Sequence, residues 1–149
     1  MGSVITQRRD HRRERNEFYR SKIQQCYALT FKVDEAYSQE ELTLALLVEV
    51  KNVSSYIARK LDDGEDGMGL SDQLLSIIMI YLPDLAECAR EYREAEARLV
   101  VKKARLYEDY RNIKKAVYEA AIKDAFTPFW EKGDELRALL VLEVKKYTP

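Results

Sequence analysis

Apolar residues recur along most of the chain at the three- and four-residue spacing that is typical of amphipathic α-helices. The first such segment runs from residue 4 to about residue 36, with an apolar stripe formed by Phe18, Ile23, Tyr27, Leu29 and Val33. Its front end, residues 8–15, is polar all round. We therefore treat residues 1–15 as a basic tail that can be disordered on its own.

A second helix is predicted to begin at Ser38, because Ser38 and Glu41 have the spacing of a capping box. In that motif the serine hydroxyl accepts from the Glu41 backbone N–H, and the glutamate side chain reaches back to the cap. The helix should end near Leu61 and carry an apolar face of Leu42, Leu46, Val50, Val53 and Ile57. An acidic, glycine-rich loop over residues 62–70 follows, with three of the chain's five glycines.

The second half of the chain is also predicted to be helical, with defined interruptions. A third helix should open at Leu70 or Ser71, and Pro83 should kink or restart it, because proline removes a backbone donor and clashes one turn back. From residue 84 the pattern continues to about Tyr110, with a shared face of Ala89, Ala97, Val100, Ala104 and Tyr107. Residues 111–112 are the predicted turn into the last helix.

The last helix continues an apolar face through Ile113, Val117, Ala120 and Ala121. Thr127 as N-cap and Pro128 at the first helical position predict a restart within it. Residues 138–144 are apolar nearly all round, and a helix of that kind must be buried. We expect this burial to occur between subunits.

Composition supports an all-α fold of long amphipathic helices. The chain has 149 residues, of which 34% are charged, 5 are glycine and 3 are proline, so few positions favour a turn. The length suits one hydrophobic core, and we predict a single helical domain over residues 1–149. Heptads are not sustained, so we expect a helical hairpin or bundle that forms homo-oligomers, not a long coiled coil.

Catalytic and metal chemistry find little support in the sequence. The two cysteines, Cys26 and Cys88, lie among apolar neighbours, and the one histidine, His11, lies in a charge run. There is no Cys-x-x-Cys cluster, phosphate-binding glycine loop, nucleophile elbow or His-Glu-x-x-His pattern. We therefore expect a non-catalytic protein without metal or cofactor. No apolar run approaches the roughly 20 residues of a membrane span, and we expect a cytoplasmic location, in the host cytoplasm if the chain is viral.

Charge is segregated along the chain although the net charge is −1. Residues 1–32 hold 8 Lys/Arg against 3 Asp/Glu, residues 34–96 hold 5 against 15, and residues 98–115 hold 7 against 2. The third zone has Tyr107 and Tyr110 among its cations, which suits single-stranded nucleic acid, because cations neutralise phosphates and rings stack on bases. The competing interpretation is a set of solvated or subunit-contacting faces with core tyrosines. The candidate nucleic-acid-binding residues are Lys103, Arg105, Arg98, Lys102, Lys114 and Lys115.

Residues 92–107, with the stretch Lys103-Ala104-Arg105-Leu106, resemble the central helix of phage recombination mediator proteins of the UvsY type and related small helical proteins of tailed phages. Residues 117–125 and 136–140 resemble their last helix, so the likeness covers about residues 84–147. The resemblance implies a single-stranded-DNA binder that helps load a RecA-like recombinase onto strands covered by a single-strand-binding protein. It also implies an oligomeric ring assembled through the C-terminal helix, with Lys103 and Arg105 contacting DNA.

Two other functions stay open. The first is a structural or adaptor protein, such as a virion or assembly component, which acts through protein contacts. Its candidate interface comprises Leu139, Leu140, Leu142, Val144, Phe129 and Trp130. The second is an inhibitor that presents the acidic zone, residues 34–96, as a mimic of DNA.

Overall fold

The computed structural model describes residues 2–49 and 66–149. Within them the chain forms four α-helices and one 3-10 turn: α1 (Gly2–Glu49), α3 (Gly67–Tyr81), η1 (Pro83–Leu85), α4 (Ala86–Asp109) and α5 (Lys115–Lys145). No strand occurs in the described part of the chain. The predicted all-α helical bundle is confirmed. None of the described helices is long and apolar enough to cross a membrane.

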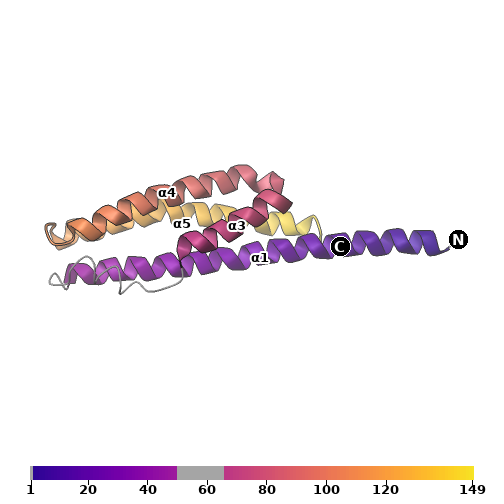
Figure 1. The fold of residues 1–149 in the computed structure, drawn as a ribbon, viewed down its shortest axis with the longest axis horizontal. Coiled ribbons are helices and arrows are strands. Elements are labelled where there is room, and N and C mark those ends of the chain that lie inside the picture. The colour runs from indigo at the N-terminus through magenta and orange to yellow at the C-terminus, as the bar shows by residue number, and fades with distance from the viewer. Residues whose placement is uncertain (1, 50–65) are drawn as a thin grey trace.

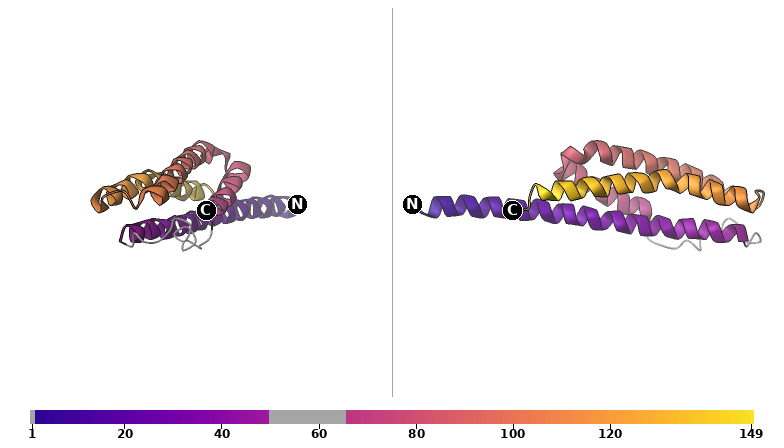
Figure 2. Two further views of the ribbon diagram at one scale, coloured as in Figure 1. Left: turned by 60° about the vertical axis from the view of Figure 1, so that its left-hand side comes forward. Right: turned by 180° about the vertical axis from the view of Figure 1, so that it is seen from behind.

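The helices form an elongated bundle in which α3, α4 and α5 lie to one side of the long α1 (Figure 1). The hairpin of α4 and α5 lies alongside α1, with α5 packed against both α1 and α4. The shorter α3 packs on α1 and turns through η1 into α4. The N-terminal part of α1 extends beyond the other helices, as both views in Figure 2 show. The bundle therefore has one end that carries a projecting helix and another end formed by the α4–α5 turn.

Helix α1 is continuous, so the predicted start of a new helix at Ser38 is wrong. Tyr37, immediately before Ser38, is buried and packs its ring against Phe129 at a centroid distance of 5.0 Å. Burial of this kind outweighs the roughly 1 kcal/mol that a capping residue contributes. The buried face continues through Leu44, Leu47 and Val48, whereas the predicted Leu42 and Leu46 are exposed. The remaining residues of the predicted second helix, 50–61, lie outside the described residues.

Helix α3 begins at Gly67, three residues before the predicted start. The side chain of Asp66 caps it, because Asp66 Oδ1 accepts from the Met68 backbone N–H at 3.0 Å. A Cβ at Gly67 would lie 2.8 Å from Cε2 of Tyr37, so glycine lets α3 approach the Tyr37 ring. The predicted loop therefore becomes helix from residue 67 on, and residues 62–65 lie outside the described part.

The predicted interruptions at Pro83 and at residues 111–112 are confirmed. Helix α3 ends at Tyr81, Pro83 opens the 3-10 turn, and residues 110–114 connect α4 to α5. The predicted restart at Thr127-Pro128 is wrong, because α5 runs through Pro128 without a break. Phe126 and Phe129 flank the proline and are both buried, and this packing holds the helix together across the missing hydrogen bond.

The predicted shared face of α4 is only partly right. Ala89 and Tyr107 are buried, whereas Ala97 and Ala104 are exposed and Val100 is half-buried. The face that packs inward is centred on Tyr92 and Leu99 instead. Large side chains thus decide which side of α4 enters the core, because they bury more apolar area than alanine.

Candidate nucleic-acid interface

Three cations form a stripe along the outer side of α4. Arg98, Lys102 and Arg105 are spaced by four and three residues, which places them on one side of a helix. All three are exposed. None of them forms an ion pair with another residue that the structure describes. We call Arg98, Lys102 and Arg105 the α4 stripe.

Several cations elsewhere on the bundle pair with carboxylates. Lys132 pairs with Glu91 and with Glu135 at 3.1 Å each, and Arg137 pairs with Asp34 at 2.6 Å. Further pairs within the described residues involve Arg90, Arg93, Lys115 and Lys146. The α4 stripe differs from the paired cations of its own helix, because no acid among the described residues pairs with it.

The structure separates Lys103 from the α4 stripe. Its ammonium group points toward α1, pairs with Glu40 and lies 5.4 Å from the centre of the Tyr37 ring. The side chain is only 17% exposed. Lys103 therefore joins α4 to α1 and is not available to a ligand in this arrangement, although it was a central candidate from the sequence.

The other candidate cations lie near the α4–α5 turn. Lys115 pairs with Glu49 of α1, so it too links two helices. Lys114 is exposed and forms no ion pair within the described residues. Besides the α4 stripe, Lys114 is therefore a cation at this end of the bundle with which no described acid pairs.

The two tyrosines of the basic zone are core residues. Tyr107 and Tyr110 are 4% and 1% exposed. They lie close to Tyr118, whose hydroxyl donates to the Leu106 carbonyl at 2.7 Å. The interpretation of these rings as core is confirmed, and the proposed stacking of bases on them is wrong for this conformation. What this surface offers a nucleic acid is charge for the phosphate backbone.

The candidate partner-docking residues divide into two groups. Phe129 and Leu140 are fully buried in the core, and Val144 and Trp130 are half-buried. The Trp130 indole N–H donates to Glu41 of α1 at 3.2 Å, so it belongs to the α1–α5 contact. Leu139 and Leu142 are exposed, and these two remain available to a partner.

A buried carboxylate that sequence analysis did not single out joins three helices. Glu96 of α4 is 0% exposed, accepts from the Tyr37 hydroxyl of α1 at 2.8 Å, and accepts from the Ser71 hydroxyl of α3 at 2.9 Å. Arg93 donates to the same carboxylate at 2.9 Å. Burial raises the pKa of Glu96, and these three donors act in the opposite direction. The available signal was its position at helical spacing between the apolar Tyr92 and Leu99.

A second polar contact joins α1 to α5. Asp34 and Arg137 pair at 2.6 Å, and the Arg137 guanidinium lies 5.1 Å from the centre of the Phe31 ring. Burial raises the pKa of Asp34 despite the arginine. Because these groups hold helices together and are shielded from solvent, we assign them to the fold and not to a reactive site.

Several acids in the described part of the acidic zone pair with cations of the fold. Asp34, Glu40, Glu49, Asp72 and Glu91 all pair with cations of other helices. Pairing of this kind reduces the free negative charge that a mimic of DNA has to present. Among the described residues, no group of three or more histidines, cysteines and carboxylates could hold a metal ion.

Comparison with known proteins adds no relative. No protein-family model, no curated protein and no solved structure matches the chain.

Proposed function

We propose that this protein is a non-catalytic accessory protein that binds the phosphate backbone of single-stranded DNA and helps load a RecA-like recombinase. The observation that carries the binding part is the α4 stripe, a row of exposed cations on a helix whose other cations, Arg90, Arg93 and Lys103, are all paired with carboxylates. Such a row gains affinity by releasing counterions from the nucleic acid.

The geometry of the α4 stripe suits an extended backbone. Cations at this spacing lie about 5–6 Å apart and span roughly 10 Å along the helix. One helix face with three cations can follow a single strand, and it offers no device for reading bases. Binding through the stripe should therefore depend strongly on salt and little on sequence. The role with a recombinase rests on the resemblance of residues 92–107 to recombination mediators.

The test compares two charge-matched double variants. Lys102→Gln/Arg105→Gln removes two cations of the α4 stripe, whereas Lys32→Gln/Lys123→Gln removes two exposed lysines from other surfaces. Fluorescence anisotropy with a labelled single-stranded oligonucleotide gives the slope of log K against log salt. The stripe variant should flatten that slope by about 1.4, because each neutralised phosphate contributes about 0.7.

The control variant should keep the wild-type slope. Equal slopes for the two variants would reject the α4 stripe as the binding surface. The same affinity for single-stranded and double-stranded oligonucleotides would reject the proposed preference for single strands. Circular dichroism checks that both variants retain their helix content.

A structural or adaptor role is the second candidate, and a specific observation favours it. Leu139, Val141 and Leu142 lie exposed on the last turns of α5, at 36%, 44% and 57%. Apolar side chains gathered in this way are typical of protein contacts. Leu139→Asp/Leu142→Asp should then reduce the mass of the assembly in light scattering. Deleting residues 138–149 is a poorer test, because it removes Leu140 from the core.

A further inference from the structure

A helical arm projects from the end of the bundle that lies opposite the α4–α5 turn (Figures 1 and 2). It is the first part of α1, and every side chain from residue 4 to residue 15 is exposed. The arm carries five arginines and two acids: Arg8, Arg9, Arg12, Arg13 and Arg15, with Asp10 and Glu14. We call residues 4–16 the basic arm.

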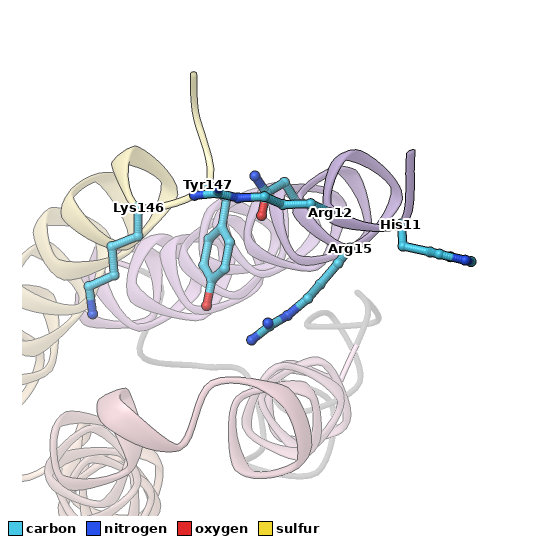
Figure 3. Close-up of a pocket in the computed structure, with 6 residues that line it drawn as sticks. His11, Arg12, Arg15, Lys146 and Tyr147 are labelled. Carbon is cyan, nitrogen blue, oxygen red and sulfur yellow. The ribbon is translucent and has the colours of Figure 1, made fainter. Parts of the chain in front are cut away.

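The basic arm meets the C-terminal end of α5 in a surface hollow (Figure 3). The hollow is lined by His11, Arg12, Arg15, Asn16, Lys146 and Tyr147. Figure 3 shows the Arg15, Tyr147 and Lys146 side chains extending to the same side, while His11 points away. The Tyr147 ring stacks on the ring of Tyr19 at a centroid distance of 5.0 Å. This stacking fixes the end of the chain against α1.

A second hollow adjoins the first, and the two share Arg12, Asn16 and Tyr147. Its lining adds Arg9, Arg13, Arg20 and Glu17. Arg13 pairs with Glu17 at 3.0 Å, whereas Arg9, Arg12 and Arg20 form no ion pair with any residue in the described ranges. Positive charge is thus concentrated on both sides of Tyr147, without enough acids to balance it.

The composition of the basic arm decides which anion it suits. Arginine presents a planar fork of donors that matches a phosphate group. Apart from Val4 and Ile5 at its start, the arm holds no hydrophobic residue, so it lacks the continuous apolar face that a helix needs to insert into a membrane surface or to form a coiled coil.

We propose that the basic arm and the C-terminal residues Lys146 and Tyr147 form a second binding site for the phosphate backbone of nucleic acid. This proposal rests on the proposed function and adds a site to it. Glu40, which contacts α4 beside the α4 stripe, lies about 28 residues beyond Arg12 on α1, or roughly 42 Å along the helix. The two sites therefore engage separate stretches of a strand.

The experiment combines a charge-neutralising variant with a location probe. Arg12→Gln/Arg15→Gln should flatten the salt slope for a single-stranded oligonucleotide by about 1.4, and combining it with Lys102→Gln/Arg105→Gln should flatten it by about 2.8. The control is again Lys32→Gln/Lys123→Gln. A photo-crosslinking amino acid in place of Asn16 should crosslink to the oligonucleotide, whereas the same group in place of exposed Glu35 should not.

The outcomes separate this proposal from the proposed function. A flatter salt slope for the arm variant, together with a wild-type slope for the stripe variant, would support the second site and reject the α4 stripe. A flatter salt slope for the stripe variant alone, with an arm variant that matches the control and no crosslink from position 16, would overturn only the second site. Absence of binding by the wild-type chain would overturn both. Binding of the arm to phosphatidylserine vesicles but not to oligonucleotides would also overturn the second site.

Discussion

Replacement of Glu96 by alanine is the perturbation that most directly tests how the bundle is held together. The carboxylate is fully buried and receives hydrogen bonds from Tyr37, Ser71 and Arg93, which belong to three different helices. Alanine removes every one of these acceptors at once. It leaves two buried hydroxyls without this acceptor, whereas Arg93 is half-buried and keeps its pair with Asp72.

The magnitude follows from the groups that lose their partner. Each buried hydroxyl left without an acceptor costs about 1–3 kcal/mol, and Arg93 adds less because it is partly exposed and keeps Asp72. These costs are not additive, and the variant also escapes the desolvation that raises the pKa of Glu96. From the two buried hydroxyls, we therefore expect Glu96→Ala to lower the free energy of unfolding by about 3–5 kcal/mol.

The assay is urea denaturation followed by circular dichroism. For a slope near about 2 kcal/mol per molar urea, the expected loss moves the midpoint by about 1.5–2.5 M. Glu94→Ala is the matched control, because Glu94 lies one half-turn away on the exposed side of α4 and bonds only to Arg90 among the described residues. Its midpoint should barely move. A Glu96→Ala midpoint as close to wild type as that of the control would refute the reasoning.

Three further predictions concern the pH dependence of stability, the reactivity of Cys26 and the proline in α5. Because burial raises the folded-state pKa of Glu96 above its ordinary value of 4.5, wild type should lose stability relative to Glu96→Gln as the pH rises through that raised pKa; denaturation midpoints that differ by a constant amount from pH 4 to pH 8 would contradict this. Burial raises the pKa of Cys26 to about 11, so iodoacetamide at pH 8 should label it far more slowly in the folded protein than in urea, as peptide mass spectrometry measures; equal rates would count against its burial. Pro128→Ala should stabilise the protein by about 1–3 kcal/mol, because it restores a helical hydrogen bond at an exposed position; a lower melting temperature would show that α5 needs the proline.

Local signals in the sequence predicted the elements that local forces decide. Pro83 follows the end of a helix because it lacks a backbone N–H donor and its ring clashes with the preceding turn, and both effects are local. The helix boundaries predicted at Ser38 and Pro128 were wrong. The capping and proline preferences of these residues compete with burial of Tyr37, Phe126 and Phe129, which depends on packing between helices. Periodicity alone could not tell whether such burial would outweigh a cap or a proline.

The candidate site shows the same division. The spacing of Arg98, Lys102 and Arg105 was visible in the sequence, and the structure leaves these residues exposed. The separation of Lys103 from them was not predictable, because its partner Glu40 lies 63 residues away in the chain. An ion pair between residues so far apart in the chain depends on how the helices pack, so no local sequence pattern indicates it. Glu96 could have been noticed, since a carboxylate between apolar positions of one helix face requires donors in the core.

The central claim is that the protein binds the backbone of single-stranded DNA by charge. The most direct measurement is fluorescence anisotropy of the full chain with labelled single-stranded and double-stranded oligonucleotides at two salt concentrations. We predict binding that prefers the single strand, weakens steeply with salt and does not depend on base sequence. Absence of binding at the lower salt concentration, where electrostatic contacts are strongest, would contradict the account and favour the assembly role of the exposed leucines on α5.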